Sequence, residues 1–172
     1  MSEICKVMVS AQKNLVIYLQ IAKCLLLPFS HISGRYLYAE ASGKSKNDSA
    51  ALASATIGPT STFRYASKPC MMSFWYHMRG SRIGSLNVYQ ATNYGSMDNL
   101  VWAKSGDQGS RWVKGVVSLT SDKDFQIIIQ AKMGVSFQGD IAIDDVIFSP
   151  ECVFNGNQLP GEFKRVKYTL LL

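Results

Sequence analysis

The chain has 172 residues, of which 47% are hydrophobic, 11% aromatic and 17% charged, and its formal net charge is +6. This length allows one domain with a sizeable core, and the apolar content excludes a wholly disordered chain. The basic residues are scattered, which favours an ordinary solvated surface over a site for anionic glycans or acidic surfaces. Nucleic-acid binding is excluded, because it would need a dense basic stripe and a matching motif.

Residues 1–33 are an atypical leader. The stretch 15–29 is apolar, but Gln20 and Lys23 interrupt it, and it is shorter than the about 20 apolar residues of a membrane-spanning helix. We consider three interpretations, in this order: a displaced start of the following domain, a signal-like segment preceded by basic residues, and a buried helix.

Short strands are predicted along the rest of the chain, because alternating apolar and polar residues are separated by turn signals and show no helical period. They recur every 10 to 15 residues, at 35–41, 50–57, 70–79, 84–90, 100–103, 112–119, 125–130 and 141–148. This spacing predicts an all-β protein built as an antiparallel β-sandwich of the jelly-roll type.

Two of these strands each carry a cysteine at one end. The strand that opens on Cys70 places Met72, Phe74, Tyr76 and Met78 with that cysteine on one face, and Met71, Ser73, Trp75, His77 and Arg79 on the other. The later strand alternates Ile141 and Ile143 against Ala142, Asp144, Val146 and Phe148, and the run closes on Cys152. The pair suggests one sandwich that is stapled across the chain.

These residues resemble the MAM domain, an extracellular β-sandwich module named after meprin, a neuropilin and a mu-type receptor phosphatase. The resemblance lies in GRYLYAEAS at 34–42 and in the ordered runs CMMSFWYHMRG, IGSLNVY, LVWAKSGDQGSRW, DFQIIIQA and GDIAIDDVIFSPEC. Within this family, the chain is similar to the MAM modules of MAM and LDL-receptor class A domain-containing proteins. The opening of the family pattern is missing or replaced, so we divide the chain into the leader 1–33, a MAM-like sandwich 34–152 and a linker-like tail 153–172.

Cysteine usage and one short motif point to the secretory pathway. A Cys70–Cys152 bridge would close a long loop, which the chain-entropy model values at about 4–5 kcal/mol, and it implies an oxidising compartment. Whether Cys5 and Cys24 pair stays open, and no C-x-x-C occurs that would suggest zinc. Asn47, Asp48 and Ser49 form an N-glycosylation sequon, which is consistent with secretion.

Clustered carboxylates provide the candidate metal ligands. Asp144 and Asp145 follow Asp140 closely, and a calcium or sodium ion at Asp144 and Asp145 would suit their oxygen ligands. The resemblance adds to this, because some MAM domains are thought to hold such an ion. In the alternative interpretation these carboxylates accept hydrogen bonds from backbone amides or pair with an arginine. No cofactor is required.

The predicted function is recognition and not catalysis. No nucleophile elbow, zinc-protease motif or phosphate loop occurs, so we expect no enzyme activity. Trp75, His77 and Arg79 share one predicted face and form the candidate interaction surface. The resemblance implies an extracellular interaction or adhesion module of a larger cell-surface or secreted protein, with protein partners that include a second copy, and with membrane contact only through the parent protein. The alternatives are a calcium-assisted glycan-binding sandwich and an accessory domain of a secreted protease.

Overall fold

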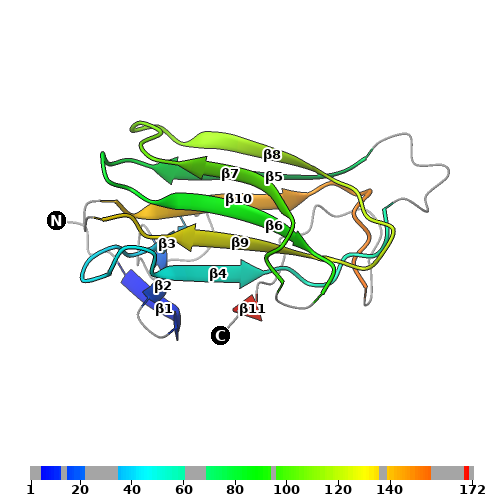
Figure 1. The fold of residues 1–172 in the computed structure, drawn as a ribbon, viewed down its shortest axis with the longest axis horizontal. Coiled ribbons are helices and arrows are strands. Elements are labelled where there is room, and N and C mark those ends of the chain that lie inside the picture. Colours follow the sequence, from blue (N-terminus) through cyan, green and yellow to red (C-terminus); the bar gives the residue numbers. More distant parts are fainter. Residues whose placement is uncertain are drawn as a thin grey trace, which may run out of the picture.

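The computed structural model describes residues 5–12, 15–21, 35–60, 69–93, 96–135, 139–155 and 169–170. Within these ranges the strands form two antiparallel sheets that pack against each other (Figure 1). The six-stranded sheet has the order β1 (Cys5–Gln12), β2 (Leu15–Ile21), β3 (Arg35–Ala39), β10 (Ile141–Phe148), β5 (Cys70–Met78), β8 (Val113–Leu119). The five-stranded sheet has the order β11 (Thr169–Leu170), β4 (Ser49–Ala53), β9 (Gln126–Lys132), β6 (Ser85–Ala91), β7 (Leu100–Ser105). The predicted all-β sandwich is confirmed.

The alternation predicted for β5 is confirmed in its packing. Met72, Phe74 and Met78 are completely buried between the sheets, whereas Trp75 on the other face is exposed. Phe74 lies across Gly115 of β8, where a Cβ atom would come within 2.6 Å of the phenyl ring. A side chain at residue 115 would therefore displace the ring, and the glycine is what allows Phe74 to fill this part of the core.

β10 departs from the predicted alternation. A β-bulge lies between Asp144 and Ile147, which pair with Trp75 and Ser73, so three steps along β10 face two steps along β5. Asp145, the first residue inside the bulge, has a φ of 44°, in the left-handed region. The extra residue moves Val146 and Phe148 onto the core face that Ile141 and Ile143 occupy. The prediction that put Val146 and Phe148 on the opposite face is wrong for this reason.

The Cys70–Cys152 disulfide is present and confirms the predicted staple. Its Cα atoms are 4.8 Å apart, and both cysteines are buried. It joins the first residue of β5 to the chain that follows β10, and these two strands are neighbours in the six-stranded sheet. The bridge therefore fastens two strands of one sheet at their shared end and does not link the two sheets.

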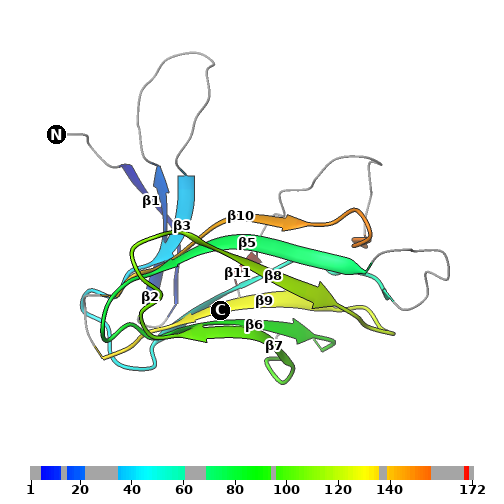
Figure 2. The same ribbon diagram turned by 90° about the horizontal axis from the view of Figure 1, so that it is seen from above.

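The strands β1, β2 and β3 turn out of the sandwich at one end. β2 pairs with β3, and β1 pairs with β2. Figure 2 shows these three strands rising from the plane of β10, β5 and β8. Residues 15–21 form a strand, which contradicts the buried-helix interpretation for this part of the stretch 15–29, and residues 22–29 lie outside the described residues. Cys24 lies outside the described residues, and the described ranges contain no helix that could cross a membrane.

Candidate interaction surface

The outward side of β5 and β8 carries an unusual number of exposed apolar side chains. We call this surface the β5–β8 face and define it by Trp75, His77, Trp112, Lys114 and Val116. Among the residues whose side-chain burial is described (36–60, 69–93, 96–135 and 139–155), the exposed large hydrophobic side chains are Trp75, Leu100, Trp112, Val116 and Val135, and three of these five belong to the β5–β8 face. Their exposed fractions are 40% for Trp75, 38% for Trp112 and 51% for Val116. Antiparallel pairing brings them together, because Trp75 pairs with Lys114 and Ser73 pairs with Val116.

An aromatic cluster fixes one end of this face. The indole of Trp112 lies 5.4 Å from the ring of Tyr36 in an edge-on contact, and 5.7 Å from the ring of His77. Tyr36 comes from β3 and Trp112 directly precedes β8, and the strands β10 and β5 lie between β3 and β8 in the sheet. β10 contributes Ala142 there, which pairs with His77 on one side and Tyr38 on the other. Ala142 is buried although it lies on the outer face of the sheet.

The surroundings of Tyr36 disfavour its ionised form. Burial raises the pKa of its phenol above the ordinary value of 10.0, and the neighbouring Tyr38 and the carboxylate of Asp140 raise it further. All three causes disfavour the phenolate. The shift matters only in alkaline solution, because a phenol with the ordinary pKa of 10.0 already carries its proton at neutral pH.

Charges of both signs flank the exposed indole of Trp75. Lys114 pairs with Trp75 from β8, and Asp144 pairs with it from β10. Arg79 lies just beyond the end of β5 and is exposed. Of the three residues predicted as an interaction surface, Trp75 and His77 thus lie on the β5–β8 face and Arg79 lies past the end of their strand. Their role in binding stays a prediction.

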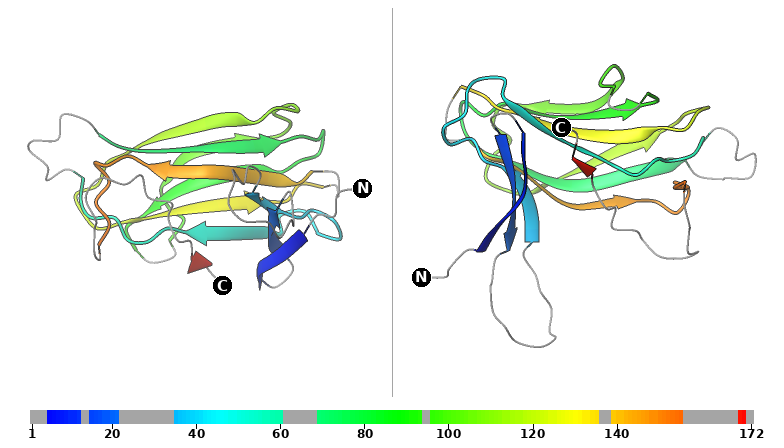
Figure 3. Two further views of the ribbon diagram at one scale, coloured as in Figure 1. Left: turned by 180° about the vertical axis from the view of Figure 1, so that it is seen from behind. Right: turned by 90° about the horizontal axis from the view of Figure 1, so that it is seen from below.

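The β5–β8 face extends to an open sheet edge. β8 is the last strand of its sheet, and within the described ranges no strand pairs with its other side. β7 ends the five-stranded sheet, and Figure 1 shows β7 and β8 along the same margin of the sandwich. The left view of Figure 3 shows the six-stranded sheet from its outer side, where β8 borders β5 without a further neighbour. A partner on the β5–β8 face would therefore also reach unpaired backbone groups of β8.

Of the two carboxylates predicted as metal ligands, that of Asp144 accepts a hydrogen bond from a backbone amide, as does the neighbouring carboxylate of Asp140. Asp144 Oδ1 accepts a hydrogen bond of 2.8 Å from the amide of Asp145, inside the bulge. Asp140 Oδ1 accepts one of 2.9 Å from the amide of Ala41. Across the described ranges, no three His, Cys, Asp or Glu side chains gather as a metal site requires. The calcium or sodium ion at Asp144 and Asp145 stays a prediction.

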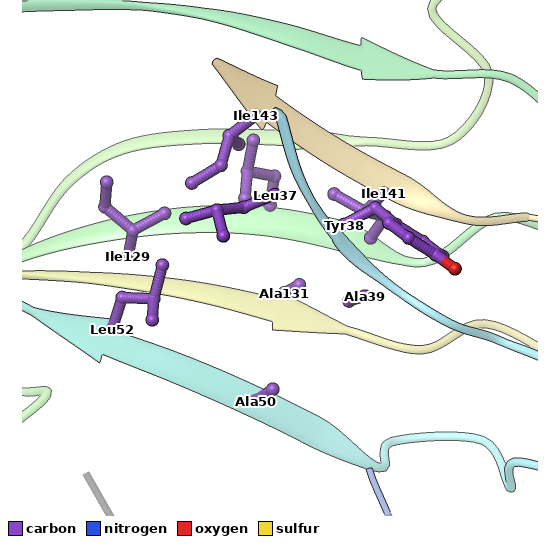
Figure 4. A pocket seen from close by; sticks show the side chains of 10 residues that line it. Leu37, Tyr38, Ala39, Ala50, Leu52, Ile129, Ala131, Ile141 and Ile143 are labelled. Carbon is purple, nitrogen blue, oxygen red and sulfur yellow. The ribbon is translucent and has the colours of Figure 1, made fainter. Parts of the chain in front are cut away.

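A small cavity lies between the sheets, away from the β5–β8 face. It has a volume of about 20 Å³, and its lining is apolar apart from Tyr38. Figure 4 shows Leu52 and Ile129 on one side of it, with Ala39, Ala50 and Ala131 contributing only methyl groups. A space of this size holds at most one water molecule. It is a packing gap left by small side chains, and it is too small for an organic ligand.

Sequence reasoning missed the contributions of Trp112, Val116 and Tyr36. A signal for Val116 is present in the alternation of 112–119, because Gly115 and Val117 face inward and their neighbours must face outward. The contact between Tyr36 and Trp112 has no such signal. It depends on the order of β3, β10, β5 and β8 within the sheet, which local patterns do not give.

Comparison with known proteins identifies the family. The family model of the MAM domain, meprin/A5/mu, matches residues 26–153. Neuropilin-1a of Danio rerio is 40% identical over 117 residues, which cover 66% of this chain and 12% of that protein. MAM domain-containing glycosylphosphatidylinositol anchor protein 1 of Gallus gallus is 39% identical over 115 residues, covering 66% and 12%. MAM domain-containing protein 2 of Homo sapiens is 36% identical over 115 residues, covering 67% and 16%.

The chain therefore spans 12% to 16% of the length of these three relatives. Among solved structures, the K3 cleaved adhesin domain of Lys-gingipain from Porphyromonas gingivalis superposes with a TM-score of 0.55 at 10% identity, covering 85% of this chain and 90% of that one. At this identity the similarity concerns the fold alone. The family match, the relatives and the two-sheet architecture agree, and the chain belongs to the MAM domain family.

Proposed function

We propose that this chain is an extracellular recognition module of a larger cell-surface or secreted protein, and that it binds protein partners through the β5–β8 face. The observation that carries the proposal is the grouping of Trp75, Trp112 and Val116, exposed side by side next to an open edge. Exposed apolar groups that are contiguous mark interaction sites, whereas single ones are ordinary. Tryptophan is also among the residues that contribute most to binding energy at interfaces.

Localisation outside the cytosol is supported by the chemistry of the fold and by the relatives. The buried Cys70–Cys152 bridge requires an oxidising compartment during folding. Relatives of this chain include proteins named for a glycosylphosphatidylinositol anchor, which holds a protein at a membrane. In this proposal the membrane is contacted by other parts of the parent protein. The module supplies recognition and no catalysis.

A protein partner suits the charges of the β5–β8 face. Lys114 and Asp144 lie on opposite sides of Trp75, so a complementary surface needs an acidic group, an apolar group and a basic group within a few ångströms. Folded proteins offer all three on one patch, and a second copy of this chain is one such partner. An accessory role in a secreted protease would use the same kind of contact.

The experiment compares two exposed valines. Beads coated with the full chain are tested for self-aggregation, and the soluble chain is tested against a panel of extracellular proteins. Val116→Lys places a charge on the β5–β8 face, and Val135→Lys makes the same change at an equally exposed valine elsewhere. We expect Val116→Lys to weaken binding at least tenfold and Val135→Lys to leave it unchanged. Equal effects of the two variants, or no binding by the unmodified chain, would contradict the proposal.

A second candidate function, glycan binding, is favoured by the exposed indole rings of Trp75 and Trp112. Flat aromatic rings can stack on the apolar faces of sugars, and the predicted ion at Asp144 and Asp145 would assist. A glycan array read with calcium and with a chelator separates the candidates. Calcium-dependent hits that Trp75→Ala abolishes would favour the glycan, and an array without hits would remove this candidate.

A further inference from the structure

Asn47 is the only asparagine of the chain that is followed two positions later by serine or threonine. Asn47, Asp48 and Ser49 thus form its single sequon for N-linked glycosylation. A sequon arises often by chance, so we ask whether the folded domain could accommodate a glycan at this position. An N-linked glycan is bulky, so the folded domain must hold the modified asparagine side chain on its surface and free of packing.

The structure places Asn47 on such a turn. Its side chain is exposed, and its φ of 73° lies in the left-handed region, which asparagine tolerates better than most residues. The backbone around it is held firmly. The amide of Asn47 donates to the carbonyl of Met133 at 3.0 Å, and the amide of Met133 donates to the carbonyl of Asp48 at 2.7 Å. Asp48 also accepts a hydrogen bond of 2.9 Å from the amide of Ser45.

The turn lies far from the β5–β8 face. It leads into β4, whose first residue Ser49 pairs with Lys132 of β9. In the five-stranded sheet, β9 and β6 separate β4 from β7, so β4 lies about 14 Å from the margin that β7 and β8 share. Figure 1 shows β4 along the lower margin and β8 along the upper one. A group attached to the turn before β4 would leave the open edge uncovered.

We propose that Asn47 carries an N-linked glycan, attached on a rigid turn at the margin opposite to the open β8 edge. The buried Cys70–Cys152 disulfide independently supports passage of the chain through the secretory pathway, because such a bridge forms under oxidising conditions. N-glycans are transferred in the same pathway. The glycan restricts any partner to the remaining surface, including the β5–β8 face. This inference goes beyond the proposed function and does not depend on it.

The test directs the full chain into the secretory pathway of a eukaryotic host with an added signal peptide. Gel mobility is compared before and after treatment with peptide N-glycosidase, which converts a glycosylated asparagine into aspartate that peptide mass mapping detects. Secreted and retained pools are both scored, because the glycan is transferred before export. Asn47→Gln and Ser49→Ala remove the sequon in two ways, and Ser49→Thr preserves it. Asn93→Gln is the matched control, since Asn93 is an exposed asparagine without a sequon.

We expect one mobility step for the unmodified chain, for Ser49→Thr and for Asn93→Gln, and conversion to aspartate at residue 47. Asn47→Gln and Ser49→Ala should both lose the step. Two substitutions are used because glutamine at a positive φ strains the turn, whereas Ser49→Ala leaves the backbone of Asn47 unchanged. Chain with an intact Cys70–Cys152 bridge and no mobility step would overturn the proposal, as would a step that persists in Ser49→Ala.

Discussion

The outer faces of the two sheets differ in how far their apolar side chains are buried. On the five-stranded sheet, a second apolar cluster formed by Ala51, Ala53, Ala91 and Ile128 is buried, and Tyr89 and Met97 pack against it. On the six-stranded sheet, Trp75, Trp112 and Val116 stay exposed. Apolar residues on an outer face therefore do not by themselves mark a recognition surface. What distinguishes the β5–β8 face is that the described part of the chain leaves it uncovered.

Loss of the disulfide is expected to lower the free energy of unfolding more than any other change considered below, because the bridge joins two neighbouring strands of the six-stranded sheet. Replacing Cys70 and Cys152 together by alanine should lower the free energy of unfolding by about 4–5 kcal/mol in the chain-entropy model, for a sequence separation of 82 residues. Denaturant unfolding of both proteins measures this difference. Equal midpoints would mean that hydrogen bonding alone holds β5 and β10 together.

Truncation of Ile128 tests the covered face directly. Its side chain is completely buried, so Ile128→Ala should lower the free energy of unfolding by about 3 kcal/mol, through lost transfer energy and the cavity left behind. Val116→Ala on the open face removes two carbons from a half-exposed side chain and should change stability by less than about 0.5 kcal/mol. Comparable losses in thermal and denaturant unfolding would abolish the distinction between the two faces.

The polar side chains around the buried apolar cluster of the five-stranded sheet should contribute less to the free energy of unfolding than Ile128 does. Gln130 Oε1 accepts hydrogen bonds from Asn87 Nδ2 at 3.2 Å and from the Tyr89 hydroxyl at 3.5 Å, and Gln130 Nε2 donates to the sulfur of Met97 at 3.4 Å. Gln130→Leu keeps the volume and removes these bonds, and we expect a loss of about 1 kcal/mol. Ser118→Ala on exposed β8 is the control, and an effect as large there would argue against the network.

Truncation of Trp75 should separate recognition from stability. Trp75→Ala is expected to change the free energy of unfolding by less than about 1 kcal/mol, because the indole is 40% exposed. The same variant should weaken partner binding by about 2 kcal/mol or more, as buried tryptophan anchors do at interfaces. Paired unfolding and binding measurements on one preparation give both numbers. A large loss of stability with unchanged affinity would show that Trp75 stabilises the fold and does not take part in binding.

The smallest expected effect concerns pH. The pKa of Tyr36 is raised in the folded chain, mainly by burial, so as the pH passes 10.0 the unfolded chain loses its phenolic proton more readily. The folded state then binds more protons than the unfolded state, and stability falls with rising pH above this value. Tyr36→Phe removes this contribution and should flatten the decline, while Tyr76, whose pKa burial also raises, remains. Identical alkaline profiles would contradict this assignment.

Local alternation was enough to predict the inner face of β5, and the bridge between Cys70 and Cys152 was suggested by two long strands that each carry a cysteine at one end. It was insufficient for β10, because a single aspartate within a strand does not announce a β-bulge, and the extra residue at Asp145 shifts every later side chain by one position. The aromatic cluster was also beyond prediction. Tyr36 and Trp112 are separated by 76 positions in the sequence, and only the order of four strands brings their rings within 5.4 Å.

The disulfide also determines how the module responds to tension. In an array of domains anchored at a cell surface, a pulling force acts on the two ends of each module and tends to extend the chain between them. The covalent link from Cys70 to Cys152 bears that force, so the interval between the two cysteines, a sequence separation of 82 residues, is not stretched. Roughly 280 Å of contour length, at about 3.4 Å per residue, is thereby withheld from extension. The strands β5, β8 and β10, which hold the β5–β8 face, lie in the shielded interval, so stretching of the flanking segments would leave this interval closed until the bond is reduced.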